Sequence, residues 1–166
     1  LIETRSKKFK SILKKGRYII TPSEFVKKKY LGFGLPKTKI VVLPHGVSPV
    51  GLKMRRSNNI VNFAYLGTFY EFKGLEILVR AFALVNTAKT KLTIYSDYKV
   101  NPSFFRAIKK IAGRLPIKFA GGYSHDNLAL ILKDVDVVVV PSIVPESFNL
   151  VVREAQSAGI PVIASK

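Results

Sequence analysis

The chain has 166 residues, a net charge of +18 and no cysteine. This length supplies one good hydrophobic core but is too short for two complete Rossmann-type domains. The lack of cysteine excludes disulfides and thiol chemistry, and the apolar runs are strand-sized, too short to span a bilayer. The charge is concentrated in residues 1–56, where 15 lysines and arginines face two acids, a net +13. Such a segment either attracts polyanions or forms a solvated helix face.

The first third of the chain predicts two helices, two short strands and a linker. Apolar residues at helical spacing among lysines predict a basic amphipathic helix over 1–15. A proline and a serine predict the start of a second helix over 23–30, which two glycines then end. Short strands are expected at 17–20 and 39–43. Proline, glycine and polar residues with weak periodicity make 48–59 an expected linker between domains.

From residue 60 onward, the pattern alternates regularly between strands and helices. The strands are apolar on both faces, and helices of about ten residues separate them, so we expect a parallel sheet with helices on both faces. The expected strands are 60–66, 91–95, 117–120, 135–140 and 160–164, and the expected helices are 74–86, 102–112, 124–133 and 149–158. The predicted fold class is therefore α/β, a Rossmann-like parallel sheet.

Residues 141–164 give the first indication of a binding site. The valine run 137–140 ends at Pro141, a loop follows, and helical spacing then resumes. A helix entered from the carboxyl end of a parallel strand directs its first N–H groups into the crevice where such sheets bind ligands, and these groups favour phosphate. Glu146 and Glu154 would accept hydrogen bonds from sugar hydroxyls there. The alternative is that Glu146 supports the helix N-terminus and Glu154 is solvated.

These residues resemble the GT-B glycosyltransferases, specifically the large family four branch, whose members are mostly retaining and use nucleotide sugars. Glu146 and Glu154, in ESFNLVVRE, look like the EX7E motif of that family, and the following AQSAGIPVIAS is similar to its EAMAxGxPVIAS. FAYLGTFYEFKG, over 63–74, resembles its FxGRLxxxKG. Residues 19–48 look like the end of a first domain that leads to the NGVD crossover. Chance agreement of four motifs in the same order is a poor explanation.

The resemblance implies roles for the residues of these motifs. Glu154 would accept hydrogen bonds from the ribose hydroxyls of the nucleotide, while Glu146 would face the donor sugar as a catalytic residue. Lys73 would be the second catalytic residue, because it would neutralise charge on the leaving diphosphate. Thr68 occupies the position of the family's second cation, an arginine, and supplies a hydrogen bond but no charge. Backbone N–H groups would hold the phosphate and the sugar at Ser147, Phe148, Asn149 and Leu150.

Residues at the helix start and at other strand ends are also expected to line the crevice. At the helix start, Asn149 stands where the family has glycine, and its side chain would crowd the donor. Gly67 follows the first strand of the repeat and is expected to contact the donor. Gly122 and the glycine before it would let a flat base approach, with Tyr123 stacked on it, although a tight turn explains the glycines equally well. Ser142 either lines the crevice or caps its loop.

The two histidines and the acidic residues predict no metal site. His45 stands where the family has asparagine at the crossover and is expected to be structural, and His125 is expected to be exposed at a helix start. No aspartate pair or Cys/His cluster has the spacing of metal ligands. The resemblance likewise implies metal-independent chemistry without a cofactor, because lysine and helix dipoles replace a divalent ion.

The resemblance assigns the chain to half of a two-domain enzyme. Residues 1–47 would be the remnant of the acceptor-side domain and the crossover, 48–59 the linker, and 60–166 the nucleotide-sugar donor-binding domain, with truncation at its C-terminus left open. We expect a glycosyltransferase of glycan biosynthesis that moves a glycosyl group, with retention, from a UDP-, GDP- or ADP-linked sugar to an acceptor glycan or a lipid-linked sugar. The isolated chain is expected to bind nucleotide and transfer little.

Two other classes of function stay open. Thr68, Asn149 and the net charge motivate a basic module that kept the fold, lost the enzymatic activity and docks on nucleic acid or an anionic membrane through residues 1–56. This reading can coexist with the first, because a lipid-linked acceptor would bring a transferase to a membrane; no specific nucleic acid is expected. The expected location is the cytoplasm, including the inner membrane surface. The other class is another GT-B activity, a phosphorylase or a sugar-nucleotide epimerase.

Overall fold

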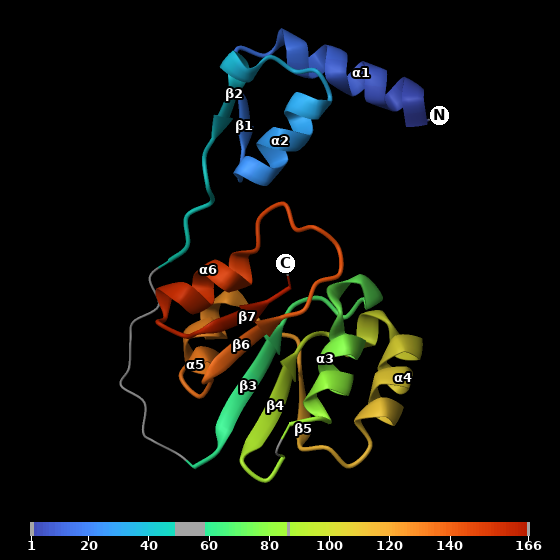
Figure 1. The fold of residues 1–166 in the computed structure, drawn as a ribbon, viewed down its shortest axis with the longest axis vertical. Helices are drawn as coiled ribbons and strands as arrows, with labels where there is room; N and C mark the ends of the chain where they lie inside the picture. The colour runs from blue at the N-terminus through green and yellow to red at the C-terminus, as the bar shows by residue number, and fades with distance from the viewer. Residues whose placement is uncertain (1, 49–58, 86, 166) are drawn as a thin grey trace. The chain divides into compact units, whose positions relative to one another are not determined.

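The computed structural model describes residues 2–48, 59–85 and 87–165 (Figure 1). By its internal contacts the chain divides into an N-terminal unit, residues 1–46 with 146–148, and a sheet unit, residues 47–145 with 149–166. Residues 49–58, most of the predicted linker, lie outside the described residues. The assignment of residues 1–47 to an acceptor-side domain stays a prediction.

The N-terminal unit contains two helices and one short pair of parallel strands. The helices are α1 (Ile2–Lys15) and α2 (Glu24–Gly32), the strands are β1 (Ile19–Thr21) and β2 (Ile40–Val42), and the 3-10 turn η1 (Lys37–Lys39) precedes β2. Ser23 caps α2, because its Oγ accepts a hydrogen bond of 3.3 Å from the N–H of Val26. Ile19, Leu35 and Ile40 form a small core, and α1 contributes no buried residue to it.

The sheet unit is built on five parallel strands in the order β5-β4-β3-β6-β7. The strands are β3 (Val61–Leu66), β4 (Thr90–Tyr95), β5 (Ile117–Gly121), β6 (Val137–Val140) and β7 (Val162–Ala164). The helices are α3 (Leu75–Phe82), α4 (Pro102–Ala112), α5 (Leu128–Leu132) and α6 (Leu150–Ser157), with 3-10 turns η2 (Glu71–Lys73), η3 (Tyr98–Val100) and η4 (His125–Asn127). The predicted α/β fold class is confirmed.

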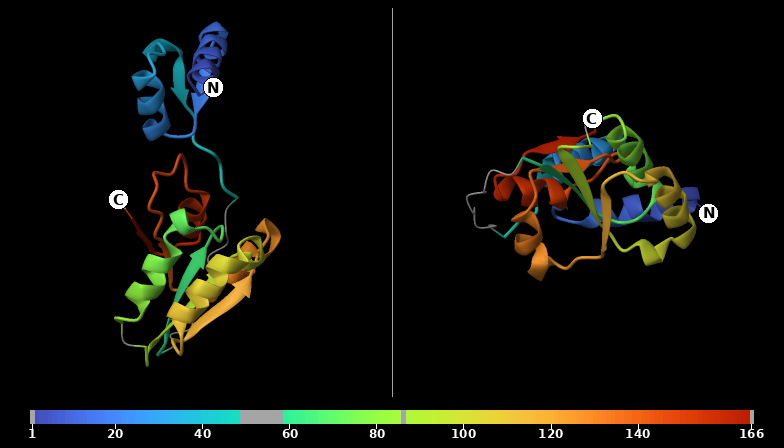
Figure 2. Two further views of the ribbon diagram at one scale, coloured as in Figure 1. Left: turned by 90° about the vertical axis from the view of Figure 1, so that its right-hand side faces the viewer. Right: turned by 90° about the horizontal axis from the view of Figure 1, so that it is seen from below.

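Two hydrophobic cores lie on opposite faces of this sheet, because side chains alternate along each strand. Leu92 and Ile94 pack with α3 and α4 in one core, whereas Ala64 and Val138 pack with α5 and α6 in the other. Figures 1 and 2 show α3 and α4 together on one side of the sheet and α5 and α6 on the other. The carboxyl ends of the strands therefore open between two helical layers.

Several predicted boundaries were wrong. The helix expected over 74–86 ends at Phe82, because the N–H groups of Leu84 and Val85 bond to carbonyls three residues back and tighten the chain into a turn. The helix expected over 124–133 begins instead as the 3-10 turn η4, and its α-helical part starts at Leu128.

The start of β6 was also predicted too early, at 135 instead of 137. Asp136 occupies the intervening position and exchanges two hydrogen bonds with the backbone of Asn62. Its carboxylate accepts from the Asn62 N–H at 2.7 Å, and its own N–H donates to the Asn62 carbonyl at 2.8 Å. These bonds fasten the entry of β6 to β3 before the regular ladder begins.

Gly74 lets two loops meet at the carboxyl edge of the sheet. It caps α3 with a left-handed backbone (φ +72°), and a Cβ at this position would lie 1.8 Å from the carbonyl oxygen of Pro141. Beside it, the N–H of Ile143 donates to the carbonyl of Phe72 at 3.0 Å. The turn that carries Lys73 is thereby fixed against the loop that follows β6.

Candidate functional site

The loops after β3, β4, β5 and β6 lie at one edge of the parallel sheet. Gly67 and Thr68 follow β3, Gly122 and Tyr123 follow β5, and Ser142 follows β6, as the sequence predicted from the strand ends. The N–H of Gly67 donates to the carbonyl of Tyr95 at 3.3 Å, which ties the loop after β3 to the end of β4. This is the edge at which open parallel sheets bind ligands.

Glu154 is a largely buried acidic side chain that faces a histidine at this edge. It projects from α6 with 12% of its side chain exposed, and its Oε1 lies 3.5 Å from Nδ1 of His125. The alternative that Glu154 is simply solvated is therefore wrong. His125, by contrast, is 62% exposed, as expected. Its contact with Glu154 was missed, because the two residues are far apart in sequence and only the fold brings η4 over α6.

Tyr123 belongs to the same group of side chains. It is half-buried against the core on the α5 and α6 face of the sheet. Burial, and then the negative charge of Glu154, raise the pKa of Tyr123 to about 12. The phenol therefore keeps its proton at neutral pH and offers a donor near the carboxylate. The stacking of Tyr123 on a base stays a prediction.

Asn149 caps α6. Its Oδ1 accepts a hydrogen bond of 3.2 Å from the N–H of Val152, so the asparagine that departs from the family pattern supports the helix start beside the expected donor site. Leu150 is the first residue of the helix. Its N–H and those that follow belong to the first turn, where helices favour negatively charged groups.

Three predicted site residues fall in the other unit. Glu146, Ser147 and Phe148 lie between β6 and α6 in the chain and group with the N-terminal unit. Their roles toward the donor sugar stay predictions.

Lys73 and Thr68 lie in the segment between β3 and α3. Lys73 is the last residue of η2, is half-buried, and places its ammonium nitrogen 5.7 Å from the centroid of the Phe72 ring. Thr68 is exposed, and its carbonyl accepts a hydrogen bond of 2.7 Å from the hydroxyl of Tyr65. The Tyr65 hydroxyl thus holds the loop, while the Thr68 side chain is left on the surface. The roles predicted for Lys73 and Thr68 stay predictions.

The acidic and histidine side chains do not gather into a metal site within residues 2–48, 59–85 and 87–165: no group of three or more stands in an arrangement that would hold an ion. Over the same described residues, no helix is both long and apolar enough to traverse a bilayer.

Residues 61–166 match the family described as glycosyl transferases group 1, which covers the whole sheet of the sheet unit and more than half of the chain. The chain belongs to the group 1 glycosyltransferases.

The similarity to individual relatives covers more of the chain than residues 61–166. This group 1 glycosyltransferase chain is 30% identical, over 169 residues, to the lipopolysaccharide 1,2-N-acetylglucosaminetransferase of Salmonella typhimurium, with 89% of the chain and 44% of the relative covered. Among solved structures, sucrose-phosphate synthase from Thermosynechococcus elongatus is 27% identical, with a TM-score of 0.78 over 98% of this chain and 44% of that one. The chain spans less than half the length of these relatives.

A third comparison concerns the fold alone. Anabaena HepE, in its complex with UDP, aligns with a TM-score of 0.88 over the whole of this chain and 50% of its own, at 18% identity.

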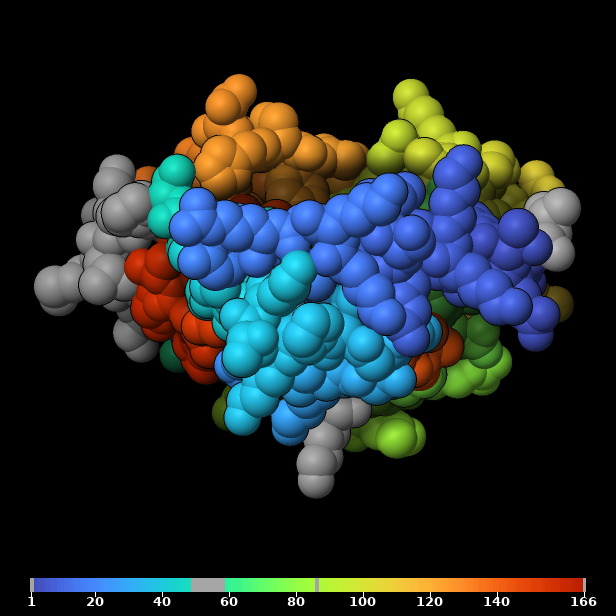
Figure 3. Space-filling view, turned by 90° about the horizontal axis from the view of Figure 1, so that it is seen from above, coloured from blue at the N-terminus to red at the C-terminus, as the bar shows by residue number. Residues whose placement is uncertain are grey.

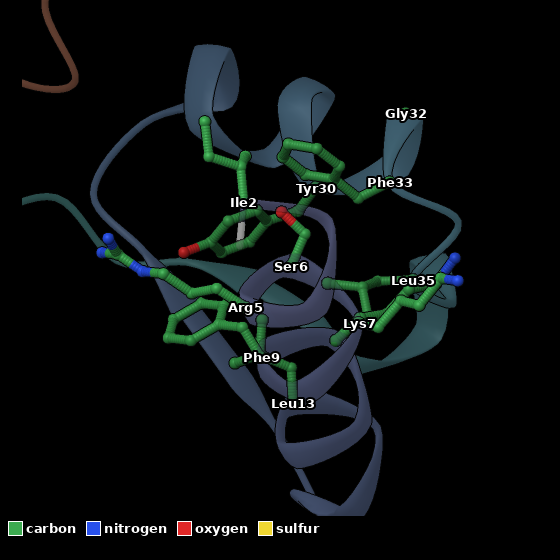
Figure 4. A pocket seen from close by; sticks show the side chains of 11 residues that line it. Ile2, Arg5, Ser6, Lys7, Phe9, Leu13, Tyr30, Gly32, Phe33 and Leu35 are labelled. Atoms are coloured by element: carbon green, nitrogen blue, oxygen red, sulfur yellow. The ribbon is translucent and has the colours of Figure 1, made fainter.

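A second candidate surface lies on the N-terminal unit. A groove of about 610 Å³ runs between α1 and the end of α2 (Figure 4). Apolar side chains line it, and cations stand among them; the lining residues are Ile2, Arg5, Ser6, Lys7, Phe9, Lys10, Leu13, Tyr30, Gly32, Phe33 and Leu35. The groove is therefore apolar at its walls and basic at its rim.

Proposed function

We propose that the sheet unit is the donor-binding half of a glycosyltransferase and binds a nucleotide-diphospho-sugar at the carboxyl edge of its sheet. The observation that carries the proposal is Glu154, a largely buried carboxylate at this edge. Burying a carboxylate is costly unless hydrogen-bond donors surround it, and two ribose hydroxyls supply such donors in a ligand. The first turn of α6, the helix that carries Glu154 further along, favours the diphosphate of the same ligand.

The proposed reaction moves the glycosyl group from the diphosphate to an acceptor hydroxyl. The bond between the anomeric carbon and the diphosphate oxygen breaks, a bond from the anomeric carbon to the acceptor oxygen forms, and the proton of the acceptor hydroxyl passes to the leaving diphosphate. Negative charge grows on the diphosphate, where the ammonium of Lys73 would stabilise it. Thr68 adds no charge there, so Lys73 would supply a larger share of this stabilisation than it would beside an arginine. Glu146 would face the sugar, and the stereochemistry would be retained.

The relatives favour certain substrates within this proposal. HepE has been solved with UDP and with UDP-glucose, which makes a uridine donor the first to test, with GDP- and ADP-sugars as alternatives. The Salmonella relative is a lipopolysaccharide 1,2-N-acetylglucosaminetransferase, which supports a glycan or lipid-linked acceptor. The chain spans half or less of these proteins, so we expect the acceptor site to need residues beyond it.

Calorimetric titration of the chain with UDP, GDP and ADP tests donor binding. We expect one of these nucleotides to bind, and Glu154→Ala and Lys73→Ala each to weaken it at least tenfold, the loss typical of a hydrogen bond to a charged group. Glu76→Ala is a matched control, because Glu76 is a carboxylate on α3 that pairs with Arg80 on the helix surface. If no nucleotide binds, or if all three variants lose affinity equally, the proposal is wrong.

A second candidate function is docking of α1 on an anionic membrane. α1 buries none of its residues, exposes Ile2, Phe9 and Ile12 by 82%, 56% and 57%, and carries six bases against one acid. In the space-filling view α1, in dark blue, lies at the surface (Figure 3). Exposed apolar side chains together with lysines are typical of helices that lie in a membrane interface. This surface would place the enzyme at the inner membrane surface, near a lipid-linked acceptor.

Co-sedimentation with vesicles tests this second function. We expect binding to vesicles that contain phosphatidylglycerol, loss of binding to pure phosphatidylcholine, and a decrease with rising salt. Phe9→Ser combined with Ile12→Ser should abolish binding, while Leu130→Ser, an exposed apolar residue of α5 in the sheet unit, should not. Equal binding by both variants, or tighter binding to duplex DNA than to vesicles, would contradict a membrane role.

A further inference from the structure

His125 is the imidazole neighbour of the proposed ribose-binding carboxylate. The turn η4 follows β5, and it brings Nδ1 of His125 to 3.5 Å from Oε1 of Glu154 on α6. This distance is within the range of an ion pair and slightly longer than a good hydrogen bond. A small rotation of either side chain closes it.

The turn does not need His125 to keep its shape. Ser124 and Asn127 form a capping box, in which the Asn127 Oδ1 accepts from the Ser124 N–H at 3.1 Å. Leu128, 2% exposed, anchors the end of the turn in the core. The imidazole of His125 is 62% exposed, and ion pairs that are this open to water add little to stability. The placement of His125 over Glu154 is thus not explained by folding.

We propose that His125 is a positioning residue, which holds the Glu154 carboxylate so that its second oxygen faces the ribose hydroxyls of the nucleotide. This inference rests on the proposed function. The imidazole approaches Oε1 and leaves Oε2, a carboxylate oxygen with two acceptor sites, for the ligand. His125 thereby favours ribonucleotides over nucleotides that lack the ribose hydroxyls.

Ligand binding strengthens the contact between His125 and Glu154. In the free chain water competes for the imidazole, but a bound nucleotide covers this edge and lowers the local dielectric constant. A hydrogen bond from the imidazole then polarises the carboxylate and orients it while the nucleotide is bound. Neutral Tyr123, the other neighbour of Glu154, adds no negative charge that would compete for the imidazole.

The experiment compares UDP with 2′,3′-dideoxy-UDP as calorimetric probes of the chain. We expect His125→Ala to weaken UDP binding by about threefold to tenfold, a range reduced for the exposure of the imidazole, and to leave dideoxy-UDP binding unchanged. His125→Asn should restore most of the UDP affinity, because its amide nitrogen occupies the position of Nδ1. Glu76→Ala, the control of the donor-binding experiment, should change neither affinity.

A combined variant shows whether His125 acts through Glu154. In the Glu154→Ala background, His125→Ala should cause no further loss of UDP affinity, because the carboxylate that it positions is gone. If the unaltered chain binds neither probe, the proposed function itself fails. If UDP binds, but His125→Ala weakens both probes equally, weakens neither, or still weakens UDP when Glu154 is absent, the positioning role is overturned and the proposed function stands.

Discussion

Replacing Gly74 with alanine should destabilise the sheet unit more than the same change at a left-handed glycine that has open surroundings. The added Cβ would lie 1.8 Å from the carbonyl oxygen of Pro141 and 2.7 Å from its carbonyl carbon. Both are backbone atoms, so no side-chain rotation relieves the clash. The loop after β6 and the turn that carries Lys73 must move apart.

The magnitude follows from two terms. A left-handed backbone at φ +72° costs alanine about 1–2 kcal/mol relative to glycine, and forcing an extra methyl group into packed surroundings costs about 1–3 kcal/mol more. The free energy of unfolding should therefore fall by about 2–5 kcal/mol, a large part of the about 5–15 kcal/mol typical of a domain. Nucleotide affinity should fall as well, because the two loops line the proposed site.

Urea denaturation followed by far-ultraviolet circular dichroism measures this loss through the transition midpoint at constant slope. Gly121→Ala is the matched control: Gly121 also has a positive φ of +85°, but a Cβ there meets no atom within 4 Å. It should lose only the backbone term, about 1–2 kcal/mol. If both variants lose the same free energy, the contact between Gly74 and Pro141 does not hold these loops together, and the reasoning is refuted.

The remaining predictions concern the cap of α6, the charge beside Tyr123 and the entry of β6. Asn149→Ala should lower the free energy of unfolding by about 1 kcal/mol, measured by urea denaturation, whereas Asn149→Gly should cost only a few tenths; equal losses would show that the cap bond is not formed. Absorbance titration should show Tyr123 ionising at a pH of about 12, a transition that the Tyr123→Phe variant lacks. Because the pKa is higher in the folded state, the stability of the chain relative to Tyr123→Phe should fall as the pH rises from about 10 to about 12. Glu154→Gln should lower that pKa only in part, because burial is the larger cause; a return to the ordinary value would contradict this order. Asp136→Ala should cost about 1–3 kcal/mol in the same denaturation assay, because it leaves the Asn62 N–H without its acceptor; no change would exclude this bond as a support of β6.

Local signals in the sequence were sufficient where neighbours in the chain decide the structure. Helix α4 was predicted with its observed bounds. The residues that set these bounds are neighbours in the chain: Asn101 caps the helix through a 3.2 Å bond to the Phe104 N–H, Pro102 occupies the first turn and Gly113 follows the end. The alternation of apolar strands with helices likewise predicted the parallel sheet. Boundaries failed where the last or first turn takes a 3-10 form, as after Phe82, since propensity does not distinguish the two kinds of turn.

The sequence by itself determined the fold class, the order of the strand ends and the family pattern, because hydrophobic periodicity and motif spacing are written in consecutive residues. Only the tertiary structure decided which side chains meet. The approach of His125 to Glu154, and the need for glycine at position 74 against Pro141, each join residues that are far apart in the chain. Such contacts depend on how loops are placed after separate strands have paired, and neither residue type nor local spacing encodes that placement.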